Sequence, residues 1–304
     1  MTQYVQLTKR NLLMYLRDRG TVFFSLLSMF VVLCLMIFFL GDINISVLTS
    51  ELSRLPGRDA QADKENALLL VLTWTTGGIV PVNAVMVTLS SYSSMIRDKR
   101  SRRSDAIYTS PVSRTVVALS YITATCLASI IICTLTFVIA EVYFVIKGAS
   151  VLSFIAHLKI FLMIVVNSFS YSAIMYLFAA LVRTESAWSG FGTVIGALVG
   201  FFGGIYMPIG QLAPTLVSIV KSTPVIYSTV MFRQVICKDM LEVIFDGVPE
   251  VVVDIYKETM GITIEIWDVN VSPLACCAIL LISGVIFLTA GMIVIEQRRK
   301  KGNK

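Results

Sequence analysis

Long apolar segments alternate with short polar ones along the whole chain. A helix needs about 20 apolar residues to cross the roughly 30 Å hydrocarbon core of a bilayer. Backbone polar groups inside lipid must be satisfied within the segment, which favours helices. The pattern therefore predicts an all-α polytopic membrane protein with six transmembrane helices. The predicted spans cover residues 21–40, 68–96, 115–140, 160–182, 190–206 and 274–295.

Residues 1–20 mix leucine and valine with Lys9, Arg10, Arg17 and Arg19. Helical periodicity with basic groups on one side is typical of a helix that lies in the membrane interface, with its charges near lipid phosphates. We expect such a helix here. The alternative is a cytosolic flank that only orients the first span.

Residues 207–236 are apolar but interrupted, so a single spanning helix is not expected there. Proline deletes a hydrogen-bond donor and clashes with the preceding turn, and glycine adds backbone entropy. The pattern predicts two short helices that dip into the membrane and return on the same face. Irregular backbone at that depth must be buried in protein or line a cavity, which makes this re-entrant segment a candidate gate. Its candidate gate residues are Pro208, Gly210, Pro214, Lys221 and Pro224.

Glycine recurs every fourth residue in the fifth predicted span, at Gly192, Gly196, Gly200 and Gly204. This spacing places the glycines on one helix face, where another backbone can approach closely. The face could pack against another span of this chain or against a partner subunit.

Composition and charge support a membrane protein and suggest its orientation. Hydrophobic residues make up 56% of the chain and charged residues only 14%. If both termini are cytosolic, the inner segments hold 16 of the 25 lysines and arginines but 5 of the 19 acids, as the positive-inside rule requires. Residues 97–114 then form a basic cytosolic loop. Residues 237–272, with eight acids and two lysines, form an extracellular segment that we expect to be a partly helical cap.

Several chemistries find no support in the sequence. Nucleic-acid binding is disfavoured because the charges are segregated by loop rather than spread over one face. No phosphate-binding loop, disulfide framework or metal-ligand spacing occurs, and His157 has no recognisable catalytic partner. The six spans lack the buried ionisable residues of a proton relay. Any energy for uphill transport must then come from another chain.

Three ordered motifs resemble those of a known family. The motifs are residues 95–100 with 109–114, which read M-I-R-D-K-R and T-S-P-V-S-R; residues 203–214, which read G-G-I-Y-M-P-I-G-Q-L-A-P; and residues 223–227, which read T-P-V-I-Y. Together with the predicted topology, they resemble the membrane subunit of a bacterial ABC-2 type transporter. The resemblance covers nearly the whole chain.

The resemblance implies an exporter in the bacterial plasma membrane, built from two permease subunits as a homodimer or heterodimer. A separate ABC ATPase under each subunit would bind ATP and magnesium, so no cofactor is expected on this chain. Residues 97–114 would contain the helix that couples to the ATPase, with residues 1–20 as the connecting helix beside it. The candidate coupling residues are Arg97, Asp98, Lys99, Arg100, Arg102, Arg103, Pro111 and Arg114.

Other functions remain open from the sequence. A secondary transporter or channel would work without an ATPase, and a membrane anchor or sensor would bind another protein without stimulating ATP hydrolysis. An intramembrane enzyme would need a nucleophile with a base, or paired acids, within the spans. The cargo is not identified, although the apolar composition favours a hydrophobic drug, peptide or lipid-linked molecule.

Overall fold

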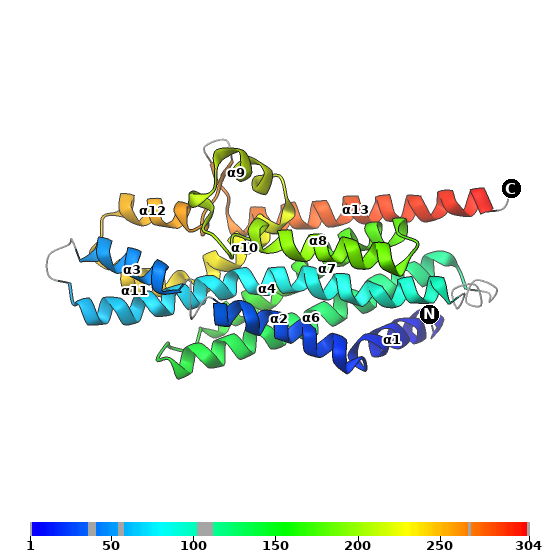
Figure 1. Ribbon diagram of the computed structural model, residues 1–304, viewed down its shortest axis with the longest axis horizontal. Coiled ribbons are helices and arrows are strands. Elements are labelled where there is room, and N and C mark those ends of the chain that lie inside the picture. Colours follow the sequence, from blue (N-terminus) through cyan, green and yellow to red (C-terminus); the bar gives the residue numbers. More distant parts are fainter. Residues whose placement is uncertain (1, 36–40, 54–57, 102–111, 267–268, 303–304) are drawn as a thin grey trace.

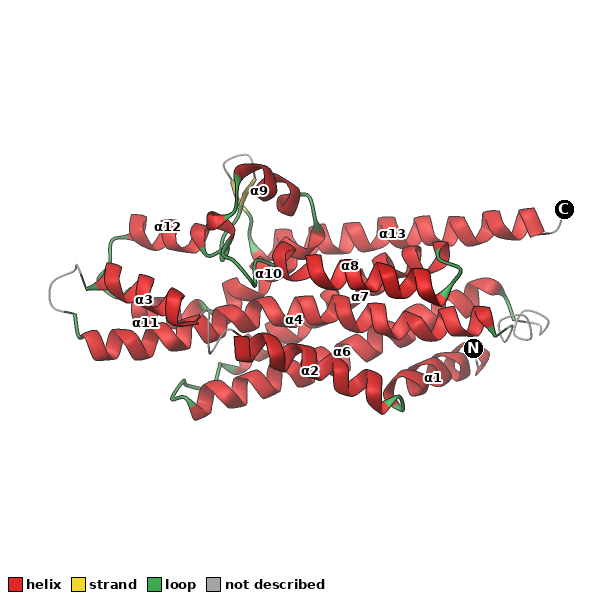
Figure 2. Ribbon diagram, viewed as in Figure 1, coloured by secondary structure: helices red, strands yellow, loops and turns green. Residues whose placement is uncertain are grey.

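The computed structural model describes residues 2–35, 41–53, 58–101, 112–266 and 269–302, most of which are helical (Figures 1 and 2). The helices of the first half are α1 (Thr2–Leu16), α2 (Arg19–Leu35), α3 (Gly41–Leu52), α4 (Ala60–Arg100), α6 (Arg114–Ile146) and α7 (Phe154–Leu181). The second half holds α8 (Glu185–Phe202), the 3₁₀ turn η2 (Ile209–Gln211), α9 (Pro214–Lys221), α10 (Pro224–Ile236), α11 (Lys238–Ile244), α12 (Glu250–Thr259) and α13 (Pro273–Gly302). Strands β1 (Glu265–Ile266) and β2 (Val269–Asn270) pair antiparallel.

Local sequence signals set the helix starts. Asp59, Ser113, Ser153 and Thr184 directly precede α4, α6, α7 and α8, and each side chain accepts a hydrogen bond from a backbone N–H of the first turn. Such caps satisfy donors that have no partner within the helix and contribute about 1 kcal/mol each. The four polar residues therefore fix where these long apolar helices begin.

The helices run roughly along one axis and define two ends of the molecule (Figure 1). Helix α1, the turn between α7 and α8, and the end of α13 lie at one end, which we call the termini end. Helices α3, α11 and α12 lie at the opposite end, which we call the cap end. Both chain termini are thus on the same side of the helix bundle.

Four helices in the described part of the chain are long and apolar enough to cross a membrane: α4, α6, α7 and α13. A fifth crossing results only if α9 and α10, bent by 87° at the break between them, are counted as one span. The other two predicted spans are less complete. Helix α2 ends at Leu35, with residues 36–40 outside the described part, and α8 ends at Phe202 rather than Tyr206.

Helix α4 is the centre of the bundle. In the most apolar 18-residue stretch of α4, 89% of the residues are buried. In the corresponding stretch of α13, only 17% are buried. Helix α4 continues through Pro81 and extends beyond the predicted span of 68–96 at both ends. At the cap end, Leu70 and Trp74 of α4 pack with Leu241 and Ile244 of α11 and Ile262 near the hairpin. The predicted cap of residues 237–272 contains α11, α12 and this hairpin, and it shares an apolar core with α4.

Three of the predicted glycines, Gly192, Gly196 and Gly200 of α8, lie against residues of the same chain. A Cβ added at Gly192 would lie 2.9 Å from Leu89, and one at Gly196 would lie 3.3 Å from Met86, both on α4. A Cβ at Gly200 would meet the ring of Tyr206. Gly204 does not continue this face, because the helix ends at Phe202 and Gly204 adopts a φ of 58° in the following turn.

We expect Gly200→Ala to lower the free energy of unfolding by about 1–3 kcal/mol, because the added methyl group overlaps an aromatic ring rather than a flexible chain end. Gly190 on the same helix has no atom near its Cβ position, so Gly190→Ala is the matched control. It should leave stability unchanged or raise it by up to about 1 kcal/mol through helix propensity. Thermal unfolding in detergent measures both. Equal effects of the two substitutions would contradict the packing at Gly200.

Candidate functional site

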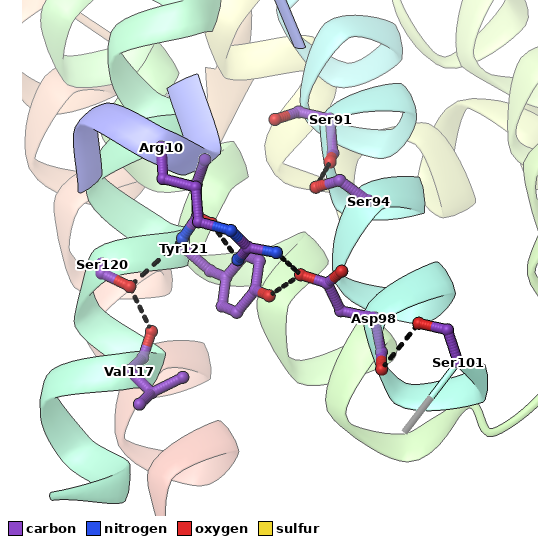
Figure 3. Close-up of polar contacts among 9 residues, drawn as sticks. Arg10, Ser91, Ser94, Asp98, Ser101, Val117, Ser120 and Tyr121 are labelled. Atoms are coloured by element: carbon purple, nitrogen blue, oxygen red, sulfur yellow. Dashed lines mark hydrogen bonds and ion pairs between the residues drawn. The ribbon is translucent and has the colours of Figure 1, made fainter. Parts of the chain in front are cut away.

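A buried charged cluster joins three helices at the termini end (Figure 3). Asp98, near the end of α4, has only 2% of its side chain exposed. One of its carboxylate oxygens accepts hydrogen bonds from Arg10 Nη2 of α1 at 2.7 Å and from the Tyr121 hydroxyl of α6 at 2.6 Å. We call Arg10, Asp98 and Tyr121 the Asp98 cluster.

Neighbouring polar contacts strengthen the attachment of α1. Arg10 also donates to Asn11 Oδ1 at 3.1 Å, and Asn11 donates to the Ser120 hydroxyl of α6 at 3.2 Å. The Tyr4 hydroxyl lies 2.6 Å from that of Thr123. Helix α1 therefore binds α6 through polar side chains, and Arg10 points into the protein rather than toward lipid phosphates as the sequence had suggested.

Exposed charges surround this cluster. Arg97 lies 3.8 Å from Asp18, which follows α1, and Arg100 lies 3.4 Å from Glu185 at the start of α8. Together with Arg17, these side chains line an open cavity of about 710 Å³. Hydrogen bonds from the hydroxyl and backbone N–H of Thr21 lower the pKa of Asp18, so this carboxylate stays ionised at neutral pH. The cavity thus presents both signs of charge to a binding partner.

The other predicted coupling residues have different surroundings. Lys99 Nζ donates to the carbonyl of Ala179 on α7 at 2.7 Å, so this lysine contacts the bundle. Arg114 is the first residue of α6. Residues 97–100 belong to α4 rather than to a loop, and Arg102, Arg103 and Pro111 lie outside the described residues. Of the charged candidates on α4, Asp98 has 2% of its side chain exposed, whereas Arg97 and Arg100 are exposed.

The predicted gate residues mark the breaks between short elements. Pro214 and Pro224 begin α9 and α10, positions at which the missing N–H costs nothing. Pro208 precedes η2, and a Cβ at Gly210 would lie 2.7 Å from the Thr259 backbone, so η2 packs closely on α12. Lys221 Nζ donates to the carbonyl of Glu265 at 2.9 Å. These contacts join residues 207–236, which we call the broken segment, to the cap of residues 237–272.

Sequence reasoning missed two features of this arrangement. The pairing of Arg10 with Asp98 joins positions 88 residues apart, and no local pattern signals it. Arg233 of α10 is fully buried. Its signal was present, because a lone arginine among Met231, Phe232 and Val235 is the kind of intramembrane charge that marks a functional position.

The fold defines a helical membrane protein in which a buried charged cluster joins three helices near their ends. Comparison with protein families matches residues 60–293, more than half of the chain, to the ABC-2 family transporter proteins. The chain belongs to this family and is a multi-pass membrane permease of an ABC-type transporter, a transport component rather than a catalytic one. No curated protein matches it significantly.

We expect Asp98→Asn to lower the free energy of unfolding by about 2–4 kcal/mol, because it leaves Arg10 without a counter-ion in a mostly buried site. Glu185→Gln is the matched control, since it removes a carboxylate from an exposed pair and should cost less than about 1 kcal/mol. Chemical unfolding in detergent measures the difference. Similar small losses for both variants would show that the Asp98 cluster does not stabilise the termini end.

Proposed function

We propose that this chain is the membrane subunit of an ATP-driven exporter and forms the substrate path with a second permease subunit. Separate ABC ATPases bind ATP and magnesium and drive it from the cytosol. The observation that carries the proposal is the Asp98 cluster, which joins the N-terminal helix, the central helix α4 and α6. Its aspartate lies between the exposed Arg97 and Arg100 on α4. A force applied there reaches three helices together.

In this proposal the termini end faces the cytosol of a bacterial cell and the cap faces outward. The basic residues concentrated near the termini support this orientation. Cytosolic termini require an even number of crossings, and the placement of both termini at one end of the bundle supports this topology (Figure 1). Helices α2, α4, α6, α7, α8 and α13 supply six crossings, and α9 with α10 forms a re-entrant gate.

The proposed coupling uses the exposed and the buried charges differently. Arg97 and Arg100 contact the ATPase, where their fork geometry suits carboxylate partners. Asp98 positions α1 and α6 relative to α4. When ATP binding draws the ATPases together, the three helices move as a unit and expose a path to the outside.

The ATPase contact predicts a charge-dependent association. We expect the double variant Arg97→Glu with Arg100→Glu to lose most co-purification with its partner ABC ATPase, and most stimulation of ATP hydrolysis in the complex. Both changes follow from like-charge repulsion at the contact. Lys238→Glu is the control, because this exposed lysine lies on α11 at the cap end. Unaltered hydrolysis in the double variant would place the contact elsewhere, and ATP-independent uptake by vesicles containing this chain alone would favour a secondary transporter.

The orientation predicts which residues react from outside the cell. We expect Lys238→Cys to react with a membrane-impermeant thiol reagent in intact cells, above the background of the native cysteines. Ser101→Cys, at the exposed end of α4, should react only after the membrane is permeabilised. Labelling is read by mass spectrometry of the purified chain. The reverse pattern would invert the topology, and labelling of both sites in intact cells would require an even number of crossings between residues 101 and 238 instead of the proposed three.

A further inference from the structure

Arg233 is buried in a position where a charge is costly. The residue belongs to α10, and its relative exposure is 0%. No aspartate or glutamate in the described part of the chain forms an ion pair with it. A buried cation without a counter-ion must be stabilised by neutral hydrogen-bond acceptors or an aromatic face.

Backbone carbonyls and one indole ring supply this stabilisation. The guanidinium donates to the carbonyls of Gly204 at 2.8 Å, Met260 and Gly261 at 3.3 Å each, and Trp74 at 3.4 Å. Its central carbon lies 4.1 Å from the centroid of the Trp74 ring. The indole N–H of Trp74 donates to the Met260 carbonyl at 2.7 Å, which closes the arrangement. We call these five residues the Arg233 centre.

The acceptors of the Arg233 centre come from three separate segments. Trp74 lies within α4, Gly204 lies in the turn after α8, and Met260 and Gly261 lie in the turn after α12. With α10, which carries Arg233, four parts of the backbone meet at one planar group. Arginine suits this role because its donors point in fixed directions around a flat fork.

Glycines create the space for the side chain. A Cβ at Gly77 would lie 2.7 Å from Arg233 Cγ, and one at Gly78 would lie 3.1 Å from Nη2. Gly204 and Gly261 have φ values of 58° and 62°, which residues with a side chain rarely adopt. The Cβ positions of both would also touch Ile209 of η2. The start of the broken segment therefore rests directly on the Arg233 centre.

We propose that Arg233 is a positioning residue that closes the cap end by fixing the turn after α8 and the turn after α12 to α4. The guanidinium binds the carbonyls of both turns and of Trp74 at once, and without it the two turns could separate from α4. In the transport cycle the broken segment and the cap then follow the movement of α4. This last step rests on the proposed function, whereas the fixing of the two turns is a property of the chain alone.

Hydrogen exchange of the full-length chain in detergent, read by mass spectrometry, tests the fixing of the turns. We expect Arg233→Ala to speed amide exchange about tenfold or more in both turns, residues 203–213 and 260–264, because local opening is no longer opposed. Lys238→Gln removes one exposed cation nearby and should leave both turns protected. Faster exchange confined to α10 in Arg233→Ala, or no change in either turn, would overturn the proposal.

Chemical rescue distinguishes a missing cation from a missing volume. Ethylguanidinium at millimolar concentration should restore protection of both turns in Arg233→Ala, whereas ethylurea, which has a similar shape but no charge, should not. Equal rescue by the two compounds would overturn the role of the charge. If Arg233→Ala does not fold, Arg233→Lys and Trp74→Phe take its place.

The two substitute variants give separate expectations. Arg233→Lys keeps the charge but lacks the fork, so at least one turn should lose protection. Trp74→Phe removes the indole N–H, so exchange should rise in residues 260–264 more than in 203–213. Protection at the unsubstituted level in both turns of both variants would overturn the proposal. The proposed function is tested separately by adding the ATPase and ATP and measuring exchange again. If ATP then changes nothing, the proposed function fails, whereas the results on the chain alone still decide whether Arg233 fixes the two turns.

Discussion

The structure depends on how charge is accommodated against α4, the most buried of the helices that can cross a membrane. An ionised side chain removed from water is tolerated only with well-placed partners. At the termini end, Asp98 has a cation and a phenol as partners. At the other end, Arg233 has carbonyls and an indole ring. Each solution draws segments from distant parts of the sequence onto the same helix.

The Asp98 cluster and the Arg233 centre differ in the charges that would lose their partners if the site opened. The Asp98 cluster contains one charge of each sign, and Arg10 is 33% exposed, so water can partly solvate Arg10 if the cluster opens. The Arg233 centre contains one unopposed charge and no exposed side-chain surface on the arginine. Opening it inside the protein would leave both the cation and its acceptors without partners, a larger penalty. Opening the Asp98 cluster therefore costs less than opening the Arg233 centre.

The all-α membrane class was predictable from the sequence, because apolar segments of bilayer length have few alternatives in lipid. The two short helices between residues 207 and 236 were also predictable, since Pro214 and Pro224 favour helix starts. The roles of charged residues were not. Asp98 and Arg97 are neighbours in one basic motif, yet one is buried and the other exposed, because helix α4 continues through both and turns them in different directions. Only tertiary packing determines which of them faces α1.

A helix can link two distant sites only if it does not bend between them. Asp98 and Trp74 are separated along α4 by roughly 36 Å at 1.5 Å per residue. Pro81 lies between them and removes one backbone hydrogen bond, which is a common cause of a kink. Helix α6 braces α4 there: Asn83 donates to the Thr136 hydroxyl at 2.8 Å, and Cys133 Sγ donates to the Val80 carbonyl at 3.6 Å. These contacts lie on both sides of the proline in sequence, and α6 also carries Tyr121 of the Asp98 cluster. The two helices together, rather than α4 alone, thus form the stiff element between the termini end and the cap end.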